Sequence, residues 1–392
     1  MTTSADLSLW ISDQKESMVS DLIEFISQET PSDNLDLLHS GLEWAENWLD
    51  KRLGEPAARR RTPGGEYGDT VVLEYPPVGN CTSWISALCH YDTVWDSGTL
   101  EGWTPTIDGD RLTGPGVFDM KAGFVQFVWA LSACNQAGID RPGIRLVLNG
   151  DEEIGSPSSR TTIEQEVSKG GPVLVFEASS NGAVKTARKG VGIFRVDVVG
   201  QEAHAGLNPE SGVSAIDEIS RLVLALHSAA DLDRGTSVNV GVLNAGTRTN
   251  VTAGRATARV DVRVTSADEA ARIDSLLTML KPHNPLARVT VEGGWNRPVM
   301  LRTERSAELF HLAAEVANEL GFELQETSVG GYSDGNFAAA LGLPVLDGLG
   351  AVGGGAHARS EWISVDGMLQ RAALTAGLIS RLSTGFPATR EP

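Results

Sequence analysis

Apolar and polar residues follow two different rhythms along the chain. In the first half, runs of consecutive apolar residues stand at 84–89, 144–148 and 172–176, and each is typical of a buried strand. Amphipathic patterns at 14–28 and 35–53 predict two helices before the first run. Because helices and strands alternate, we expect an α/β fold with a mixed, mostly parallel sheet flanked by helices.

The pattern changes near Lys189. Residues 191–199 (VGIFRVDVV) alternate in the way that is typical of a half-exposed antiparallel strand. The elements predicted after it are a helix at 213–227, strands at 237–243 and 256–264, a helix at 267–280 and a strand at 287–292. This β-α-β-β-α-β order is that of a ferredoxin-like unit. We therefore predict an inserted α+β domain at 189–298 between two parts of a larger domain, 1–188 and 299–392, which ends in a helix at 365–382.

Acids and histidines recur at the ends of the predicted strands. His90 and Asp92 follow the first run, and side chains two apart in extended backbone point the same way, so Asp92 can orient the His90 ring behind a metal. A strand-end turn with a capped histidine is the alternative. The other candidates are Asp119 (GPGVFDMKAG), Glu152 and Glu153 (LVLNGDEEIGS), Glu177 (PVLVFEAS) and His357 (GAVGGGAHARSEW). Ligands of open α/β sheets bind beyond the carboxyl ends of the strands, so this recurrence predicts one shared site.

These residue types suit a site for two Zn²⁺ ions. Zinc accepts histidine nitrogen and carboxylate oxygen, and two ions about 3.5–4 Å apart need a bridging ligand. We assign the bridge to Asp119, which lies in a glycine-rich turn. His90 and Glu177 would complete the shell of one ion, and Glu153 and His357 that of the other. Co²⁺ or Mn²⁺ would suit the same ligands.

Glu152 is left without a metal in this assignment. Neighbouring residues of an extended segment point apart, so Glu153 can bind an ion while Glu152 faces the substrate. We expect Glu152 to take a proton from the metal-bridging water and to deliver it to the leaving amine.

Six motifs in order carry a resemblance to a known family: HYDTV, GVFDMKAG, DEEIGS, FEAS, EAHAG and the late histidine. They resemble the zinc aminoacyl hydrolases, which include glutamate carboxypeptidase, acetylornithine deacetylase, succinyl-diaminopimelate desuccinylase, aminoacylase and carnosine dipeptidases. The resemblance runs from about Leu7 to Leu382, is nearest to the glutamate carboxypeptidase subgroup, and implies the same ligands and base. One departure is that His-Ala-Arg-Ser stands at the last ligand, where that subgroup often has His-Ser or His-Gly, which leaves open an effect of Arg359 on the pocket.

The resemblance also implies features that the residues alone do not. The peptide bond after Asp119 is expected to be cis, and the inserted domain is expected to act as a lid and to carry the interface of a homodimer. His204, in EAHAG, would reach across that dimer and help to polarise the scissile carbonyl of the partner's substrate. Asn250, in GTRTNVT, would contact substrate. Taken alone, His204 is more typical of a turn or a partly buried group, and Asn250 is equally typical of a β-turn.

Three further residues are candidates for binding substrate. Arg297, in GGWNRPVM, has the planar fork that matches a carboxylate, although an arginine at a hinge explains it nearly as well. Ser333 and Asn336 lie in GGYSDGNFAA, which resembles the substrate-facing loop of the family. Helix capping is the alternative explanation for Ser333.

Composition narrows the class of partner. The formal net charge of −19 argues against nucleic acid and anionic membranes as partners. Three cysteines are too few for a disulfide framework, which favours reduced thiols and a cytoplasmic location. The start of the chain lacks the pattern of a signal peptide, and no apolar run approaches the roughly 18 residues of a membrane span.

The sequence therefore predicts a dinuclear zinc hydrolase that releases an amino acid with a free carboxylate from a small peptide or N-acyl amino acid. A glutamate carboxypeptidase-like reaction is the first hypothesis, and an N-acyl amino acid deacylase with the same machinery is the second. A non-catalytic metal-binding protein would not need all five ligands and the base. Phosphoester cleavage has no support, because the sequence offers no phosphate-cradling loop.

Overall fold

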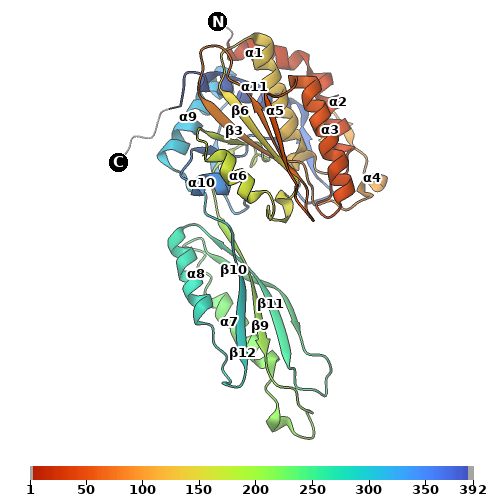
Figure 1. Cartoon of the computed structure of the whole chain (residues 1–392), viewed down its shortest axis with the longest axis vertical. Helices are drawn as coiled ribbons and strands as arrows, with labels where there is room; N and C mark the ends of the chain where they lie inside the picture. The colour runs from red at the N-terminus through yellow and green to blue at the C-terminus, as the bar shows by residue number, and fades with distance from the viewer. Residues whose placement is uncertain (1–2, 387–392) are drawn as a thin grey trace. The chain divides into compact units, whose positions relative to one another are not determined.

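The computed structural model describes residues 3–386, which form two compact units (Figure 1). The first unit contains the chain up to Ala187, Arg302–Val329 and the residues from Ser333 on, and the second contains Arg188–Leu301 and Gly330–Tyr332. The insertion predicted at 189–298 lies inside the second unit. Gly330–Tyr332, which the prediction placed in the larger domain, groups with the second unit instead.

A six-stranded sheet forms the centre of the first unit, in the order β1-β2-β6-β3-β7-β14. Along the sheet these strands are Ala58–Thr62, Thr70–Tyr75, Gly143–Asn149, Trp84–His90, Val173–Val175 and Val345–Leu346. The four strands β6, β3, β7 and β14 run parallel to one another. Strand β2 pairs antiparallel with β6, and β1 pairs antiparallel with β2. This is the mixed, mostly parallel sheet that the sequence predicts. Strands β6 and β7 are buried along their whole length, which explains why their residues are continuously apolar.

Helices pack around this sheet. They are α1 (Ser4–Asp13), α2 (Lys15–Ile26), α3 (Leu35–Leu53), α4 (Thr99–Gly102), α5 (Ala122–Ala137), α6 (Arg160–Val167), α9 (Glu304–Glu319), α10 (Gly335–Ala340) and α11 (Val365–Leu382). The predicted helices at 14–28, 35–53 and 365–382 correspond to α2, α3 and α11. The sequence pattern missed α1, although Thr3 and Asp6 form the capping box that begins it.

Helix α5 is the most buried helix of the first unit. Together with the preceding π-type turn η1 (Val117–Lys121), it is the one stretch within residues 3–386 that is long and apolar enough to cross a membrane, and 94% of its most apolar window is buried inside the protein. It packs against α11, α3 and α2, as a core helix does. The sequence has an apolar helical pattern from Met120 on, but polar residues such as Gln126 interrupt it, so no uninterrupted apolar run of about 18 residues is present.

A second, smaller sheet joins two distant parts of the first unit. Its order is β15-β16-β5-β4, and its strands are Gly353–Gly354, Trp362–Ser364, Arg111–Thr113 and Thr106–Asp108. The pairing of Trp362 with Thr113 places the loop at 355–361 beside the segment that leads into η1. Strands of two or three residues leave no periodic signal, so none of these was predicted. A further pair, β8 (Val184–Arg188) with β13 (Glu326–Val329), completes the described strands of this region.

The second unit has the predicted ferredoxin-like order of elements. They are β9 (Gly190–Val199), α7 (Ala215–Ser228), β10 (Ser237–Ala245), β11 (Arg255–Val264), α8 (Ala267–Met279) and β12 (Arg288–Arg297). The four strands form one antiparallel sheet in the order β10-β11-β9-β12. Alternate residues of β9 and β11 are buried in a separate hydrophobic core with the two helices, as the alternating sequence pattern indicates.

Strand β12 is longer than predicted. Two glycines, Gly293 and Gly294, follow the apolar residues, and glycines usually mark the end of a strand in a sequence pattern. In the structure pairing with β9 continues past them to Arg297, with an irregular register between Trp295 and Arg297. Gly293 has a φ of +106° and approaches the Ile193 carbonyl too closely for a side chain, so the bend requires glycine.

Candidate metal centre

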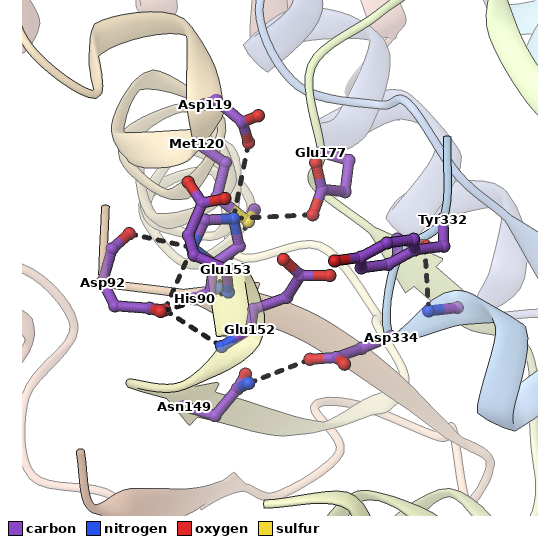
Figure 2. A network of polar contacts seen from close by, with 12 residues as sticks. His90, Asp92, Asp119, Met120, Asn149, Glu152, Glu153, Glu177, Tyr332 and Asp334 are labelled. Carbon is purple, nitrogen blue, oxygen red and sulfur yellow. Dashed lines mark hydrogen bonds and ion pairs between the residues drawn. The ribbon is translucent and has the colours of Figure 1, made fainter. Parts of the chain in front are cut away.

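The ends of three parallel strands bring the predicted ligands together (Figure 2). His90 is the last residue of β3, and Glu177 stands two residues beyond the end of β7. Glu153 lies in a short 3₁₀ turn, Glu152–Ile154, that follows β6. Because β6, β3 and β7 are adjacent and parallel, their carboxyl ends meet at one edge of the sheet.

Two ligands come from loops rather than from the main sheet. Asp119 lies in the turn η1, where its own φ and ψ are not helical and its peptide bond to Met120 is cis, as the resemblance implies. His357 lies in the loop that connects β15 and β16, with a left-handed φ of +59°. The small sheet therefore determines where these two segments meet.

Glycines position the segment that carries Glu177. A side chain at Gly123, in α5, would stand 1.9 Å from the carbonyl oxygen of Phe176, and one at Gly350 would stand 2.2 Å from the same atom. The absence of both side chains allows two backbone segments to enclose the end of β7. Glu177 is thereby held against the site from both sides.

The first group of potential ligands consists of His90, Asp119 and Glu177. The His90 Nε2 atom lies 3.4 Å from Asp119 Oδ1 and 3.5 Å from Glu177 Oε1. The His90 side chain is 1% exposed, and Glu177 is buried as well.

The second group consists of Asp119, Glu153 and His357. The His357 Nε2 atom lies 3.4 Å from Asp119 Oδ2 and 3.2 Å from Glu153 Oε2. The two oxygens of Asp119 thus face one histidine each, so this single carboxylate belongs to both groups. That is the arrangement expected of a bridging ligand.

These distances and atoms fit a pair of metal ions. Ligand atoms about 2.0–2.1 Å from a tetrahedral centre lie about 3.3 Å from one another, close to the separations in both groups. Two buried atoms, His90 Nε2 and Glu153 Oε1, have no hydrogen-bond partner among the described residues, and one belongs to each group. Buried polar atoms rarely lack partners, so an ion at each group explains both.

Asp92 supports the first group from behind. The His90 Nδ1 atom lies 3.0 Å from the Asp92 carbonyl oxygen and 3.4 Å from its Oδ1, so Nδ1 carries the proton and Nε2 is left to bind an ion. The same carboxylate accepts the backbone N–H groups of Glu152 and Glu153 at 3.2 and 3.1 Å and the hydroxyl of Ser32 at 2.8 Å. Asp92 therefore orients the histidine and the acidic turn together.

The turn at Glu152 joins a second buried polar network. Glu152 is buried and stands beside Glu153 on the short turn drawn in Figure 2. Near the base of this turn, Asp334 accepts hydrogen bonds from Asn149 Nδ2 at 2.9 Å and from the Ser156 hydroxyl at 2.5 Å. Both ends of the turn are therefore fixed by hydrogen bonds to buried carboxylates.

The charges of the site favour a cation. Contacts with Asp119 and Glu153 raise the pKa of His357 to about 10. Burial and the nearby charge of Asp119 raise the pKa of Glu153 to about 7. Burial acts to lower the pKa of His90, but its contacts with Asp119, Asp92 and Glu177 outweigh this and hold that pKa well above its usual value. His90, His357 and Glu153 thus hold protons more tightly than usual, in a place where metal ions would supply the same positive charge.

The second unit brings His204 and Asn250 together. Both are exposed, the Ala205 N–H donates to the Asn250 carbonyl at 3.0 Å, and His204 forms a β-bridge with Val251. The His204 Nδ1 atom accepts the N–H groups of Gly206 and Leu207 at 3.1 and 3.2 Å. The proton of a neutral His204 is therefore on Nε2, which makes that atom a hydrogen-bond donor.

Of the four predicted substrate-binding residues, Arg297, Ser333 and Asn336 are buried. The Arg297 side chain, in the second unit, lies over the ring of Tyr332 at 5.0 Å and donates to Asn296 Oδ1 at 3.0 Å. In the first unit the Ser333 hydroxyl donates to Asp347 at 2.5 Å, and Asn336 Oδ1 accepts the Ser333 N–H at 3.0 Å. Both side chains are therefore held by hydrogen bonds at the start of α10, whose N-cap residue is Asp334.

Sequence reasoning missed Glu361. Its fully buried carboxylate accepts hydrogen bonds from the turn that carries Asp119. The signal available was a lone glutamate four residues after His357, at the start of a three-residue strand. Such a residue cannot be distinguished from a solvated acid without knowing which backbone groups face it.

A family model agrees with this geometry. The model of peptidase family M20/M25/M40 matches residues 88–381, which include every one of the five grouped ligands.

Curated relatives and solved structures extend the similarity to most of the chain. Carboxypeptidase G2 of Pseudomonas sp. (strain RS-16) is 29% identical over 386 residues, or 95% of this chain and 91% of the relative. Succinyl-diaminopimelate desuccinylase of Gluconacetobacter diazotrophicus is 28% identical over 308 residues, or 74% and 77% of the two chains. A tripeptidase structure from Staphylococcus aureus is 19% identical with a TM-score of 0.77, covering 94% of this chain and 99% of that one, which supports the fold alone.

Proposed function

Because the chain belongs to peptidase family M20/M25/M40, we propose that it is a dinuclear zinc hydrolase that cleaves an amide bond and releases an amino acid with a free carboxylate. Its class, a metal-dependent amidohydrolase or peptidase, follows from the family. The observation that carries the finer proposal is the placement of Asp119 in both ligand groups, with one oxygen toward each histidine.

The residues of the site divide the work of hydrolysis. The two ions, when bound, would polarise the scissile carbonyl and make the attacking water more acidic. Glu152 accepts the proton of that water and passes it to the departing amine, so that no free amide anion has to form. Asp92 holds His90 and the backbone of Glu152 in place together, because its carbonyl oxygen pairs with His90 Nδ1 and its carboxylate accepts the Glu152 N–H.

His204 and Asn250 would complete the site from a second copy of the chain. His204 offers an Nε2–H donor on an exposed loop, which suits stabilisation of the oxyanion formed at the carbonyl. A homodimer through the second unit is supported by the exposed apolar side chains of Ile216 and Leu224 on α7 and of Val242 and Leu243 on β10, an edge strand of its sheet.

Similarity to known enzymes narrows the choice of substrate, that is, of the acyl group and of the amino acid released. Carboxypeptidase G2 is similar over nearly the whole chain, so a carboxypeptidase acting on a C-terminal amino acid is our first candidate. Similarity to desuccinylases favours an N-acyl amino acid deacylase as the second. The roles of Arg297, Ser333 and Asn336 in substrate binding stay predictions, since all three side chains are buried. The cytoplasmic location also stays a prediction.

A substitution of the proposed base tests this function. Glu152→Gln keeps the size of the side chain and removes its ability to take a proton, so we expect hydrolysis to fall by about 10²–10⁴-fold while zinc content and unfolding temperature stay unchanged. Initial rates would be measured on C-terminal glutamate peptides, N-acyl amino acids and phosphoesters, after loading with Zn²⁺, Co²⁺ or Mn²⁺.

Two results would decide against the proposal. Full activity of the Glu152→Gln variant would remove Glu152 from the reaction. A wild-type protein that binds metal but cleaves neither class of amide would support a binding protein instead.

A further inference from the structure

Glu361 lies where the loop of His357 meets the turn of Asp119. We propose that Glu361 is a positioning residue that holds Asp119 at the distance from His357 which a shared metal ion requires. This inference rests on the proposed function, since it assigns a role toward the same ions. Glu361 itself belongs to neither group of potential ligands.

Four hydrogen bonds converge on this carboxylate. Oε1 accepts the backbone N–H groups of Phe118 and Asp119 at 2.8 and 3.0 Å. Oε2 accepts the N–H of Gly116 at 2.9 Å and the indole N–H of Trp95 at 3.0 Å. Three of the four donors belong to the short turn that presents Asp119, and the last of them is the N–H of Asp119 itself.

Only a carboxylate can satisfy all four donors. Ionised glutamate accepts through both oxygens, whereas the amide of glutamine offers one oxygen and one donor group. In a glutamine at position 361, the side-chain NH₂ group would therefore face one pair of these N–H donors and could not accept hydrogen bonds from them. Because Glu361 is fully buried, no water is available to replace the lost acceptor.

Backbone hydrogen bonds connect Glu361 to the loop of His357, just as its side-chain hydrogen bonds connect it to the turn of Asp119. The Glu361 N–H donates to the Ala358 carbonyl at 2.9 Å, and the Ala358 N–H donates to the Gly355 carbonyl at 2.9 Å. The loop from 355 to 361 is thus folded into two successive turns. A shift of Glu361 would move His357, and a shift of its carboxylate would move Asp119.

The two groups of ligands depend on Glu361 to different degrees. In the second group, both Asp119 and His357 lie on segments that Glu361 joins. In the first group, His90 and Glu177 stand at or just beyond the ends of the central strands β3 and β7, and only Asp119 depends on this contact. Loss of Glu361 is therefore expected to weaken the second group more than the first.

Zinc binding to the metal-free protein measures this difference. Titration calorimetry of the wild type is expected to show two ions per chain. In the Glu361→Gln variant we expect one ion to bind about 10–100-fold more weakly, the range typical for losing a residue that orients a ligand, with the other less affected. Combining Glu361→Gln with His357→Ala should weaken zinc binding little more than His357→Ala alone, because both act on the same ion.

A buried glutamate of the second unit provides a matched control. Glu218 also accepts two backbone N–H groups, those of His283 and Asn284, at 2.5 and 3.0 Å. Glu218→Gln should lower the unfolding temperature and leave both zinc affinities unchanged. Glu361→Asp keeps both oxygens and should recover part of the affinity that Glu361→Gln loses.

A milder variant covers the case in which Glu361→Gln does not fold. Trp95→Phe removes one of the four hydrogen bonds and should weaken the same ion by a smaller factor. Unchanged zinc affinity in a folded Glu361→Gln variant, or in Trp95→Phe if the former does not fold, overturns the inference, as does equal weakening of both ions. A wild type that binds fewer than two ions contradicts the proposed function instead, so the two failures are distinguishable.

Discussion

The two ligand groups share Asp119 but are supported in different ways. His90 and Glu177 stand at the ends of buried parallel strands, and the side chain of His90 is 1% exposed. His357 stands on a loop with a left-handed backbone, and its side chain is 54% exposed. The sheet therefore positions His90 and Glu177 of the first group, whereas the meeting of Asp119 and His357 in the second depends on hydrogen bonds between two loops.

This contrast separates folding from metal binding. Removing a buried group that many neighbours contact costs stability even without a metal, because those neighbours lose partners that water cannot replace. Removing an exposed ligand costs mainly the affinity for its ion. The two histidines are thus expected to respond differently to the same substitution.

The largest effect is expected from a direct comparison of His90→Ala with His357→Ala. Each should lose one of the two proposed ions and most hydrolytic activity. Only His90→Ala should also lower the unfolding free energy of the metal-free protein, by about 1–3 kcal/mol, because it strips contacts from buried Asp92 and Glu177. Zinc content by atomic absorption and urea unfolding of the metal-free proteins measure both. Equal losses of stability would break the contrast.

An intermediate effect is expected from pH. The raised pKa values of His357, about 10, and Glu153, about 7, mean that both hold their protons more tightly when folded. Their contribution to stability is complete below their unfolded values of about 6.5 and 4.3, and is lost as the pH rises through 7 and then 10. The unfolding temperature of the metal-free protein should therefore fall from about pH 5 to about pH 10.

His357→Gln sharpens this experiment. It should make the unfolding temperature fall less steeply in the upper part of the pH range, to which His357 and His90 both contribute, and leave the lower part in place. Differential scanning calorimetry in matched buffers would record both profiles, and a profile that falls as steeply in the variant would assign the upper step to another group.

The smallest effect is expected from Ser32→Ala. This change removes one hydrogen bond, of 2.8 Å, from the Asp92 carboxylate beside His90, and it reaches the second group only through the Glu153 N–H that the same carboxylate accepts. We expect a loss of about 1 kcal/mol in stability and a fall in kcat of less than about tenfold, with the first ion weakened more than the second. Steady-state kinetics and zinc titration would measure these changes. Equal weakening of both ions would mean that Asp92 supports the two groups to the same degree.

Much of the fold was predictable because burial leaves a pattern in the sequence. The continuous apolar runs of β3, β6 and β7 and the alternation in β9 each reflect a whole element packed on one or two faces. The predicted ends of those strands indicated that His90, Glu153 and Glu177 lie at one edge of the sheet. The grouping of Asp119 with both histidines was likewise suggested by motif order, and the structure brings these side chains together.

What escaped prediction depends on contacts between distant segments. The four short strands of the small sheet have no periodicity, so the meeting of the 355–361 loop with η1 was not visible. Arg297 was predicted to bind substrate because its chemistry suits a carboxylate. Its burial over Tyr332 follows from a residue 35 positions away, beyond the reach of any local pattern.

Gly123 and Gly350, whose backbones approach the Phe176 carbonyl oxygen, limit which substitutions this chain tolerates. At Gly123 the smallest possible addition, a single methyl group, would clash with the Phe176 carbonyl oxygen at 1.9 Å, so the segment that carries Glu177 would have to move away. Neither position makes contact through a side chain, yet both restrict which substitutions leave Glu177 in its place. Two residues that carry no functional group therefore limit which substitutions are tolerated beside a metal ligand.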